Sequence, residues 1–254
     1  MRVHRTSRCE TDSAARLDRA STLIEILVTI SIVALLAGIL IPTLVVARRQ
    51  AKGSVCAANL HFVGVASAMY LDDFAGAYWP YYTQDDGGRW WWFGYEPGGP
   101  GGGSDRPLDK SRGALATYLG STDNRLQCPS FPYNSGCYYP KFAERSASYG
   151  YNLHLSTALR SEFVDRSARV FLFADGAHFD FGDTLNEGHY ILYSDGAMAP
   201  SGYGHFRHRD KAQVLYLDGH VTPQPLRGPA YAVECGGRSG NLSDENGSSS
   251  VYGL

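Results

Sequence analysis

A single apolar run, Leu23 to Val46, constrains this chain more than any other feature. A helix over this run is about 36 Å long, which is enough to span the hydrocarbon core of a membrane. One charge, Glu25, lies near its start. A carboxylate there is costly to place in a membrane and is usually retained for a function. The run therefore predicts one membrane-spanning helix whose first turn carries a functional carboxylate.

The segment before the run is a basic leader. Residues 1–20 contain Arg2, Arg5, Arg8, Arg16 and Arg19. Arginines upstream of a first apolar helix indicate a cytoplasmic N-terminus, although basic residues also follow this run. A secretory signal peptide has a shorter apolar core with a cleavage site behind it, whereas Val46-Ala47 here leads directly into Arg48. An uncleaved signal anchor is the alternative to a processed precursor.

The junction between leader and run reads Ala20-Ser21-Thr22-Leu23-Ile24-Glu25. It resembles the N-terminus of type IV pilin-like and type II secretion pseudopilin precursors, although that family prefers Gly before the cut and Phe or Met after it. The resemblance implies that a prepilin peptidase/N-methyltransferase cuts between Ala20 and Ser21 and methylates Ser21. It implies a single-pass protein of the inner membrane, with a cytoplasmic N-terminus and a periplasmic or extracellular head.

Two positions of the apolar helix acquire roles from this resemblance. The Glu25 carboxylate is expected to face the amino terminus of a neighbouring pilin-like subunit, because opposite charges attract strongly in a low dielectric. The alternative places Glu25 at the membrane interface among the head groups. Pro42 removes a backbone hydrogen bond and is expected to kink the helix. The implied partners are the peptidase, the membrane and other pilin-like subunits in a homo- or hetero-polymer.

The rest of the composition describes a head that does not bind nucleic acid. The formal net charge is −2, so the basic surface that nucleic-acid binding requires is missing. Turn residues dominate after position 75, with 29 Gly in the chain. We therefore predict an α+β, pilin-like fold in which a long N-terminal helix packs on an antiparallel sheet with long loops. The expected segments are 1–20 (leader), 21–47 (membrane helix), 48–235 (head) and 236–254 (flexible tail).

Periodicity predicts where the helices of the head lie. The membrane helix is expected to continue from Thr22 to Phe74, and a short second helix covers 114–119. Val55, Phe62 and Met69 recur every seven residues, with Ala58 and Val65 between them. This spacing predicts the face that the helix buries against the head.

Three apolar runs predict strands at 169–174, 190–193 and 213–217, and Asp-Gly follows each of them at Asp175-Gly176, Asp195-Gly196 and Asp218-Gly219. Asp-Gly between apolar runs is typical of a tight hairpin turn. We expect these strands to form an antiparallel sheet against the helix.

A second motif spans the last of these runs. Nine residues separate His208 from Asp218-Gly219, and Cys128-Pro129-Ser130 and Ser148-Tyr149-Gly150-Tyr151-Asn152 occur earlier. Together these segments resemble prepilin-type proteins that carry an H-X9-DG head. The group His205, His208, Asp218 and His220 suggests a metal or acid–base site. We favour a structural role, in which His208 fixes a loop by a hydrogen bond and Asp218-Gly219 makes a turn.

Four cysteines remain after removal of a leader that contains Cys9, namely Cys56, Cys128, Cys137 and Cys235. Disulfides can form on the exported side of a membrane, and four cysteines have three possible connectivities. The short turn-rich loop between Cys128 and Cys137 favours a local bond, which leaves Cys56 for Cys235. The alternative is a set of reduced thiols. A zinc site is disfavoured, because no Cys-x-x-Cys pair is present.

No nucleophile with a partnered base is recognisable, so we expect a non-enzymatic protein without a cofactor or metal. Calcium is a weaker alternative, with oxygens at Asp180, Asp183, Asn186 and Glu187 in a spacing that fits no EF-hand. The aromatic segment 78–95 favours core packing over a carbohydrate platform. The favoured function is a subunit of a type II secretion pseudopilus or type IV pilus-like fibre. The alternatives are a monomeric anchored head that binds a ligand or glycan, and an anchored hydrolase using the His/Asp group.

Overall fold

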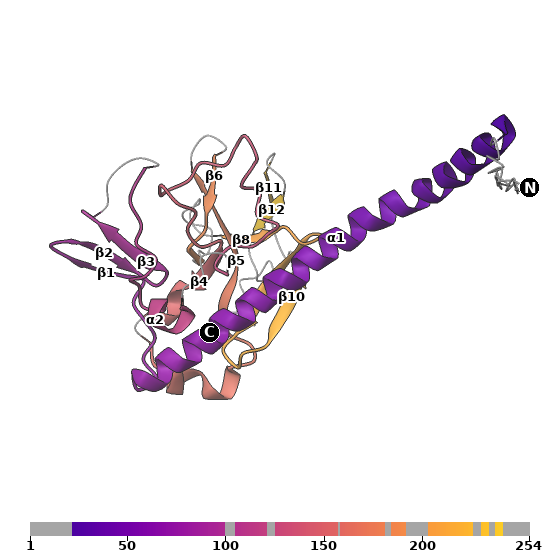
Figure 1. Ribbon diagram of the computed structural model, residues 1–254. Coiled ribbons are helices and arrows are strands. Elements are labelled where there is room, and N and C mark those ends of the chain that lie inside the picture. The colour runs from indigo at the N-terminus through magenta and orange to yellow at the C-terminus, as the bar shows by residue number, and fades with distance from the viewer. Residues whose placement is uncertain are drawn as a thin grey trace, which may run out of the picture. The chain divides into compact units, whose positions relative to one another are not determined.

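The computed structural model describes residues 22–99, 105–120, 125–156, 158–180, 184–191, 203–225, 230–233 and 237–240. Contacts within the chain form two units, Met1–Val46 and Ala47–Leu254. The first unit contributes the apolar part of helix α1 (Leu23–Asp73), and the second contains the rest of α1 and all strands (Figure 1). The α+β layout is therefore confirmed.

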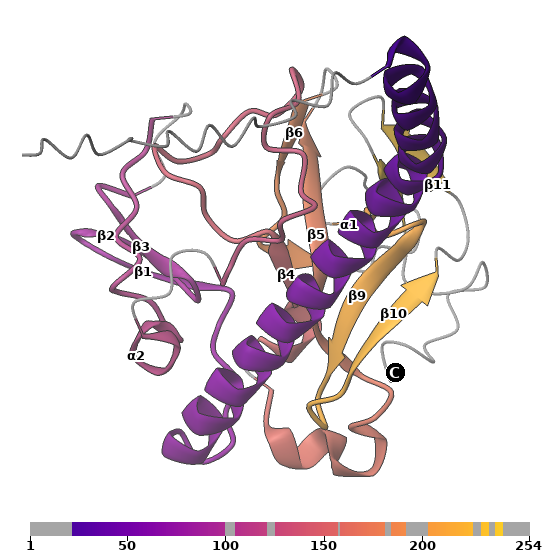
Figure 2. The ribbon, with the colours of Figure 1, turned by 45° about the vertical axis from the view of Figure 1, so that its right-hand side comes forward.

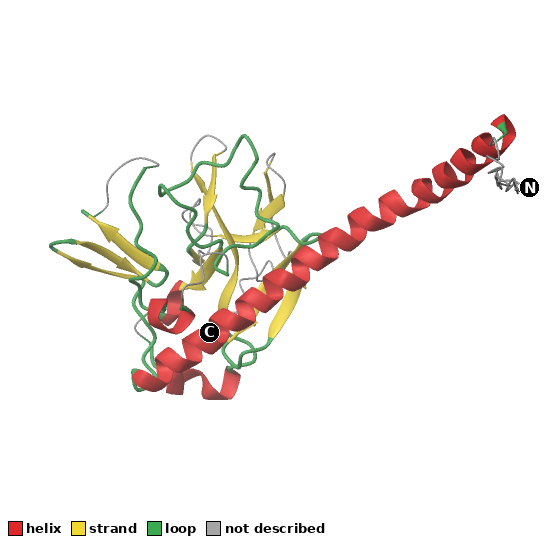
Figure 3. Cartoon of the chain, in the orientation of Figure 1, coloured by secondary structure: helices red, strands yellow, loops and turns green. Residues whose placement is uncertain are grey.

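Helix α1 follows the predicted bounds within one residue at each end (Figure 3). It begins with a capping box, in which the Thr22 N–H donates to Glu25 Oε2 (2.8 Å) and the Glu25 N–H donates to Thr22 Oγ1 (3.3 Å). This reciprocal pair satisfies two of the free N–H groups of the first turn. The helix ends where Gly76, at a φ of +80°, donates its N–H to the Leu71 carbonyl (2.6 Å). Such a bond is the usual C-terminal cap of a helix.

The apolar part of α1 has no buried face in the described structure. Every residue from Leu23 to Val46 is exposed except Ala37, which is half-buried. Among the described residues, α1 is the one helix that is long and apolar enough to cross a membrane. The helix continues through Pro42 without interruption. The kink expected at Pro42 stays a prediction.

The head part of α1 buries a different face from the predicted one. Val55, Val65 and Met69 are about half exposed. The buried residues are Gly53, Cys56, Leu60, Val63, Ala66, Ser67, Tyr70 and Leu71. The prediction was wrong because it followed the Val55–Phe62–Met69 repeat, whereas the buried face follows the Cys56–Val63–Tyr70 repeat, which is one residue further along the helix. A Cβ on Gly64 would lie 3.0 Å from Leu215 Cδ1, so only glycine fits this contact without a shift.

The described part of the head contains two sheets and several short helices. A three-stranded antiparallel sheet consists of β1 (Tyr82–Asp85), β2 (Gly88–Trp91) and β3 (Gly94–Pro97). The larger sheet contains β4 (Tyr149–Asn152), β5 (Phe171–Asp180), β6 (Thr184–Glu187), β7 (Tyr190–Ile191), β8 (Tyr203–Phe206), β9 (Lys211–Tyr216), β10 (Val221–Pro225), β11 (Ala230–Val233) and β12 (Gly237–Gly240). The short helices are α2 (Ala116–Leu119), close to its predicted range, and the 3-10 helices η1 (Leu153–Leu155) and η2 (Arg160–Arg166).

The larger sheet is organised around β5. The first half of β5 pairs with β4 and β9, and its second half pairs with β6 and β8. The order β10-β9-β5-β8-β12-β11 continues to both sides, and the described pairs are antiparallel except for β4 with β7. The head part of α1 lies against this sheet beside β9 (Figure 2). The sheet is therefore mixed rather than purely antiparallel.

Two of the three Asp-Gly expectations can be compared with the structure. Asp218-Gly219 lies in the turn between β9 and β10 as predicted. Asp175-Gly176 does not make a turn, because β5 runs through both residues. Gly176 is required there for a close approach, since a Cβ would lie 2.5 Å from the Gly188 carbonyl oxygen. Asp195-Gly196 lies outside the described residues.

The tail prediction also needs a correction. Residues 237–240 form β12, which pairs with β8 and β11. They were predicted to be flexible because the segment is rich in Ser and Gly, but strand pairing through the backbone does not depend on side chains. The remainder of the predicted tail lies outside the described residues.

Aromatic side chains form the core of the head, as the sequence predicted. Trp79, Trp92 and Phe93 are at most 1% exposed. The Trp79 ring lies 4.9 Å from the Tyr151 ring, and the Trp92 ring lies 4.7 Å from the Phe173 ring. These rings join the loop before β1 and the turn between β2 and β3 to the larger sheet, so they supply core packing rather than a binding platform.

Candidate functional site

The two ends of the His208–Asp218 motif lie in different turns. Gly219 has a φ of +91° and donates its N–H to the Tyr216 carbonyl (2.9 Å). Asp218 accepts hydrogen bonds from the backbone N–H of His220 (3.1 Å) and contacts its ring at Nδ1 (2.5 Å). The expected turn is therefore present, and the partner of Asp218 is His220 rather than His208.

His208 opens the tight turn between β8 and β9. Its backbone N–H and carbonyl both bond to Lys211, at 3.0 and 3.2 Å. The two residues between them, Arg209 and Asp210, have φ values of +55° and +57°. Positive φ at both central positions is the type I′ geometry of a two-residue turn. The His208 side chain is only 7% exposed, so the turn presents its imidazole to the interior of the head.

Four side chains of metal-binding type meet at this imidazole. They are Cys56 of α1, Cys128 of a loop, Asp175 of β5 and His208, and one ligand atom of each lies within 4.8 Å of the other three. Cys56 Sγ lies 3.1 Å from Asp175 Oδ1, and Cys128 Sγ lies 3.3 Å from His208 Nε2. His208 Nε2 lies 3.3 Å from Asp175 Oδ2. We call these four residues the Cys-Cys-Asp-His cluster.

Asp175 is held in the cluster by charge and by hydrogen bonds. Arg207 Nη2 donates to its Oδ1 (2.5 Å), and the backbone N–H of Gln213 donates to its Oδ2 (2.8 Å). Burial by itself raises the pKa of Asp175, but Arg207 and His208 together lower it to about 2. Asp175 is therefore a carboxylate at neutral pH although it is fully buried.

The Cys128 thiol and the His208 imidazole form a second charge pair. Burial opposes ionisation of Cys128, yet a hydrogen bond with Cys56 and the charge of Arg207 lower its pKa to about 5. Burial also opposes a charge on His208, but Asp175 and Cys128 raise its pKa to about 9. The opposite directions of these two shifts favour a thiolate at Cys128 beside a charged His208 imidazole. Because Cys128 is fully buried, its thiolate has no exposed surface that a substrate could approach.

The disulfides expected from the sequence are wrong for two cysteines. Cys56 and Cys128 are free buried thiols, so neither Cys128–Cys137 nor Cys56–Cys235 is a bond. Cys137 is disulfide-bonded, and Cys235 lies outside the described residues. The prediction failed because it followed distance along the chain, whereas the fold turns Cys56 and Cys128 toward Asp175 and His208.

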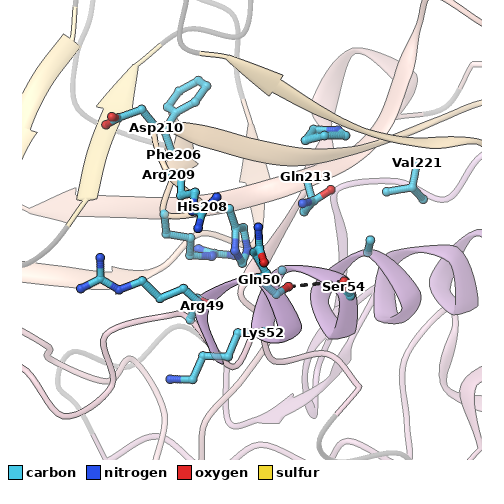
Figure 4. Close-up of a pocket in the computed structure, with 15 residues that line it drawn as sticks. Arg49, Gln50, Lys52, Ser54, Phe206, His208, Arg209, Asp210, Gln213 and Val221 are labelled. Carbon is cyan, nitrogen blue, oxygen red and sulfur yellow. Dashed lines mark hydrogen bonds between the residues drawn. The ribbon is translucent and has the colours of Figure 1, made fainter. Parts of the chain in front are cut away.

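A pocket of about 830 Å³ lies on the His208 side of the cluster. Figure 4 shows His208 and Gln213 on one side of this pocket and Gln50 and Ser54 of α1 on the other. Its lining also contains the basic side chains Arg49, Lys52, Arg207 and Arg209 and the acidic Asp210. His208 is the member of the cluster that lines this pocket, so a small solute in the pocket can approach the cluster from the His208 side.

The oxygens proposed for calcium are only partly described. Glu187 Oε1 accepts hydrogen bonds from the Tyr138 hydroxyl (2.5 Å) and the Ser146 N–H (3.3 Å). Asn186 is buried beside it in β6. Asp183 lies outside the described part of the chain. A role for these oxygens in binding calcium stays a prediction.

The processing residues of the N-terminus are only partly described. Ala20 and Ser21 lie outside the described residues, so cleavage and methylation stay predictions. Glu25 is described, and its carboxylate caps the first turn of α1 through Thr22. This capping role is local and was not anticipated from the sequence, although Thr22 followed three residues later by Glu25 is the signature of a capping box.

Sequence reasoning missed the cluster because it considered each member in another context. Asp175 was predicted in a turn, and Cys56 and Cys128 were predicted in disulfides. The absence of a Cys-x-x-Cys pair argued against zinc, but this set is assembled from four separate segments. A useful signal was Cys56 itself, since it shares a seven-residue spacing with Val63 and Tyr70 on the buried face of α1.

Comparison with known proteins does not assign a role to this arrangement. No protein-family model matches the chain, and neither a curated protein nor a solved structure matches it. The functional conclusion therefore depends on the residues and their geometry.

Proposed function

We propose that this chain is a membrane-anchored, prepilin-like subunit that a prepilin peptidase processes between Ala20 and Ser21. The mature subunit polymerises through its N-terminal helix, in a type II secretion pseudopilus or a type IV pilus-like fibre. The observation that carries the proposal is an apolar helix, Leu23–Val46, that has no buried face and one carboxylate in its first turn.

The exposure of this helix supports both anchoring and assembly. Large apolar side chains are exposed on every side of it, for example Leu23 at 77%, Leu35 at 68% and Val33 at 64%. A helix that is apolar all round is stable in lipid or in a bundle of similar helices, not in water. The same surface can therefore contact lipid before assembly and neighbouring helices in a fibre.

Glu25 supports assembly more specifically. A simple membrane anchor has no need of a carboxylate at this depth, whereas a fibre supplies a free amine at the Ser21 terminus of a neighbouring subunit. Two unit charges about 4 Å apart attract by about 4 kcal/mol at an effective dielectric constant of 20. That attraction selects one axial register between adjacent helices.

The capping box gives Glu25 a second, local role that the test must separate from assembly. Glu25→Gln retains an amide oxygen that can accept from the Thr22 N–H, but it removes the charge. Thr22→Val removes the hydroxyl that accepts from the Glu25 N–H, but it retains the charge. The two variants therefore divide helix capping from ion pairing.

The experiment is expression of these variants in the native host, with fibre or co-assembled subunit measured after shearing or cross-linking. We expect Glu25→Gln and Glu25→Ala to be inserted and cleaved normally but to lose most assembly. Thr22→Val should assemble nearly as well as the unmodified chain. Full assembly of Glu25→Gln would refute the role of the charge and favour the head-group alternative.

Within the described residues, the contacts give less support to the other two candidate functions. An anchored hydrolase would need His208 beside Asp218, and Asp218 instead contacts His220. A glycan-binding head would need a platform of exposed aromatic faces, and Trp91, Trp92 and Phe93 are buried, although Tyr82 of the same segment is 41% exposed. We therefore retain the fibre subunit as the proposed function.

A further inference from the structure

We infer that the Cys-Cys-Asp-His cluster is a structural zinc site, in which Cys56, Cys128, Asp175 and His208 each supply one ligand to a single Zn²⁺. This inference does not depend on the proposed function, because it concerns the head alone. It gives His208 of the H-X9-DG segment a role that differs from the loop hydrogen bond favoured from the sequence.

The spacing of the four side chains fits a tetrahedral ion. Zinc binds sulfur at about 2.3 Å and nitrogen or oxygen at about 2.0–2.1 Å, so neighbouring ligand atoms of a tetrahedral site are about 3.3–3.8 Å apart. The measured separations are 3.1 Å for Cys56 Sγ to Asp175 Oδ1 and 3.3 Å for Cys128 Sγ to His208 Nε2. His208 Nε2 to Asp175 Oδ2 is also 3.3 Å. The Cys56 and His208 contacts use different oxygens of Asp175, and the ligand atoms of the four side chains all lie within 4.8 Å of one another. Movements of up to about 1 Å therefore suffice for coordination.

The chemistry of the four ligands selects the metal. Two thiols and an imidazole are soft or borderline ligands that favour zinc, whereas calcium and magnesium require oxygen ligands. Four protein ligands leave no open position for water, which is typical of a structural rather than a catalytic zinc site. Full burial of Cys56, Cys128 and Asp175 agrees with that role.

The charges also balance when zinc is bound. Two thiolates and one carboxylate carry three negative charges, which Zn²⁺ and the Arg207 guanidinium together neutralise. The side chains of Arg207 and Asp175 are 1% and 0% exposed, so an unbalanced charge here would be costly. Arg207 and the Gln213 N–H also fix the orientation of the Asp175 carboxylate, as the outer partners of metal ligands commonly do.

The position of the cluster explains what the metal would stabilise. Its ligands come from α1, the loop at Cys128, β5 and the turn between β8 and β9. One ion would thus join the head part of α1 to the larger sheet. Zinc binding would displace the thiol proton of Cys56 and the proton that His208 shares with its acidic partners.

The test uses the full chain, purified in detergent under reducing conditions, stripped with a chelator and titrated with Zn²⁺ and with Co²⁺. We expect one equivalent of zinc, and a cobalt spectrum with thiolate charge-transfer bands and the intense visible bands of a tetrahedral site. This spectrum is recorded on the unmodified chain, so it does not depend on the folding of any variant.

Variants then assign the ligands. Cys128→Ser and His208→Ala should each weaken zinc binding by more than about a hundredfold. Loss of a residue that only hydrogen-bonds to a metal ligand weakens binding by about a hundredfold at most, so a larger effect identifies a ligand. His220→Ala is the matched control, because His220 pairs with Asp218 at the surface outside the cluster, and it should bind zinc normally. Tryptophan fluorescence verifies that each variant is folded.

Three results would overturn the inference. The first is a chain that binds no zinc after reduction, and the second is binding that survives both ligand substitutions. The third is recovery of a Cys56–Cys128 disulfide, without metal, from protein alkylated during extraction from the native host. Each of these would show that the two thiols serve another purpose.

Discussion

Removal of the Arg207 guanidinium should cost the head a large part of its stability. Arg207 donates to Asp175 (2.5 Å) and to the carbonyls of Ser148 (2.7 Å) and Gly176 (3.1 Å). It therefore joins the start of β4 to the middle of β5. Its side chain is 1% exposed, so water cannot replace these bonds after substitution.

The magnitude follows from the buried charge. Breaking a buried ion pair by removing one partner costs about 3–5 kcal/mol, and each additional hydrogen bond contributes about 1 kcal/mol. His208 and the Gln213 N–H still contact Asp175, which limits the loss. We therefore expect Arg207→Met to lower the free energy of unfolding by about 5 kcal/mol. That is a large share of the total for a typical domain, about 5–15 kcal/mol.

The assay is urea unfolding of the full chain in detergent, followed by tryptophan fluorescence. All four tryptophans lie between positions 79 and 92 of the head, so the signal reports the head and not the membrane helix. The control is Arg160→Met, because Arg160 forms an exposed ion pair with Asp72 at 3.3 Å. Exposed pairs contribute about 0–1 kcal/mol.

Two further variants keep the result interpretable if Arg207→Met does not fold. Arg207→Lys retains the charge and should lose less stability than Arg207→Met. The double variant Asp175→Asn/Arg207→Met should lose less stability than the two single variants lose in sum. Each single variant leaves one charge of the pair buried without its partner, whereas the double variant removes both charges. Equal losses for Arg207→Met and Arg160→Met would refute the reasoning.

Two other predictions concern pH and helix packing. Burial lowers the pKa of His189 well below its usual value of 6.5, so the stability that its neutral form provides is present above pH 6.5 and falls as the pH is lowered toward its folded pKa. In that range His189→Gln should reduce the slope of unfolding free energy against pH by about 1.4 kcal/mol per unit, the effect of one proton, and an unchanged slope would contradict the assignment. Gly53→Ala should stabilise α1 by about 0.5–1 kcal/mol, since a Cβ there meets nothing closer than 3.5 Å. Gly64→Ala should not gain stability, because its Cβ would lie 3.0 Å from Leu215, and equal melting temperatures for the two variants would argue against this contact.

The long helix and the hairpin at Asp218-Gly219 were predictable because each depends on local sequence. A continuous apolar run with a capping signal specifies α1, and Asp-Gly between apolar runs specifies a turn. The same Asp-Gly signal failed at Asp175-Gly176, which lies inside a strand. There the glycine permits close packing against the backbone of Gly188, and the aspartate forms a buried ion pair with Arg207. Local signals cannot reveal such long-range demands.

The cluster was not predictable for a related reason. Cys56, Cys128, Asp175 and His208 lie on four segments. The pairing of β5 with β8 and β9 brings Asp175 to His208, and the packing of α1 and of the Cys128 loop on the sheet adds the two thiols. The buried face of α1 was missed because two seven-residue repeats, Val55–Phe62–Met69 and Cys56–Val63–Tyr70, lie side by side on the helix, and periodicity alone does not distinguish which of them packs on the head. Sequence alone therefore supplied α1, the short helix α2 and the three strands β5, β7 and β9 of the head, but not its other strands or their contacts.

Mass spectrometry of the N-terminus tests the central claim most directly. The sample is the protein recovered from membranes of the native host, digested so that the N-terminal peptide is retained. The proposed function predicts a mature chain that begins at Ser21 and carries a methyl group on its amino nitrogen. An unprocessed chain that begins at Met1 would contradict it and would identify the protein as an uncleaved membrane anchor.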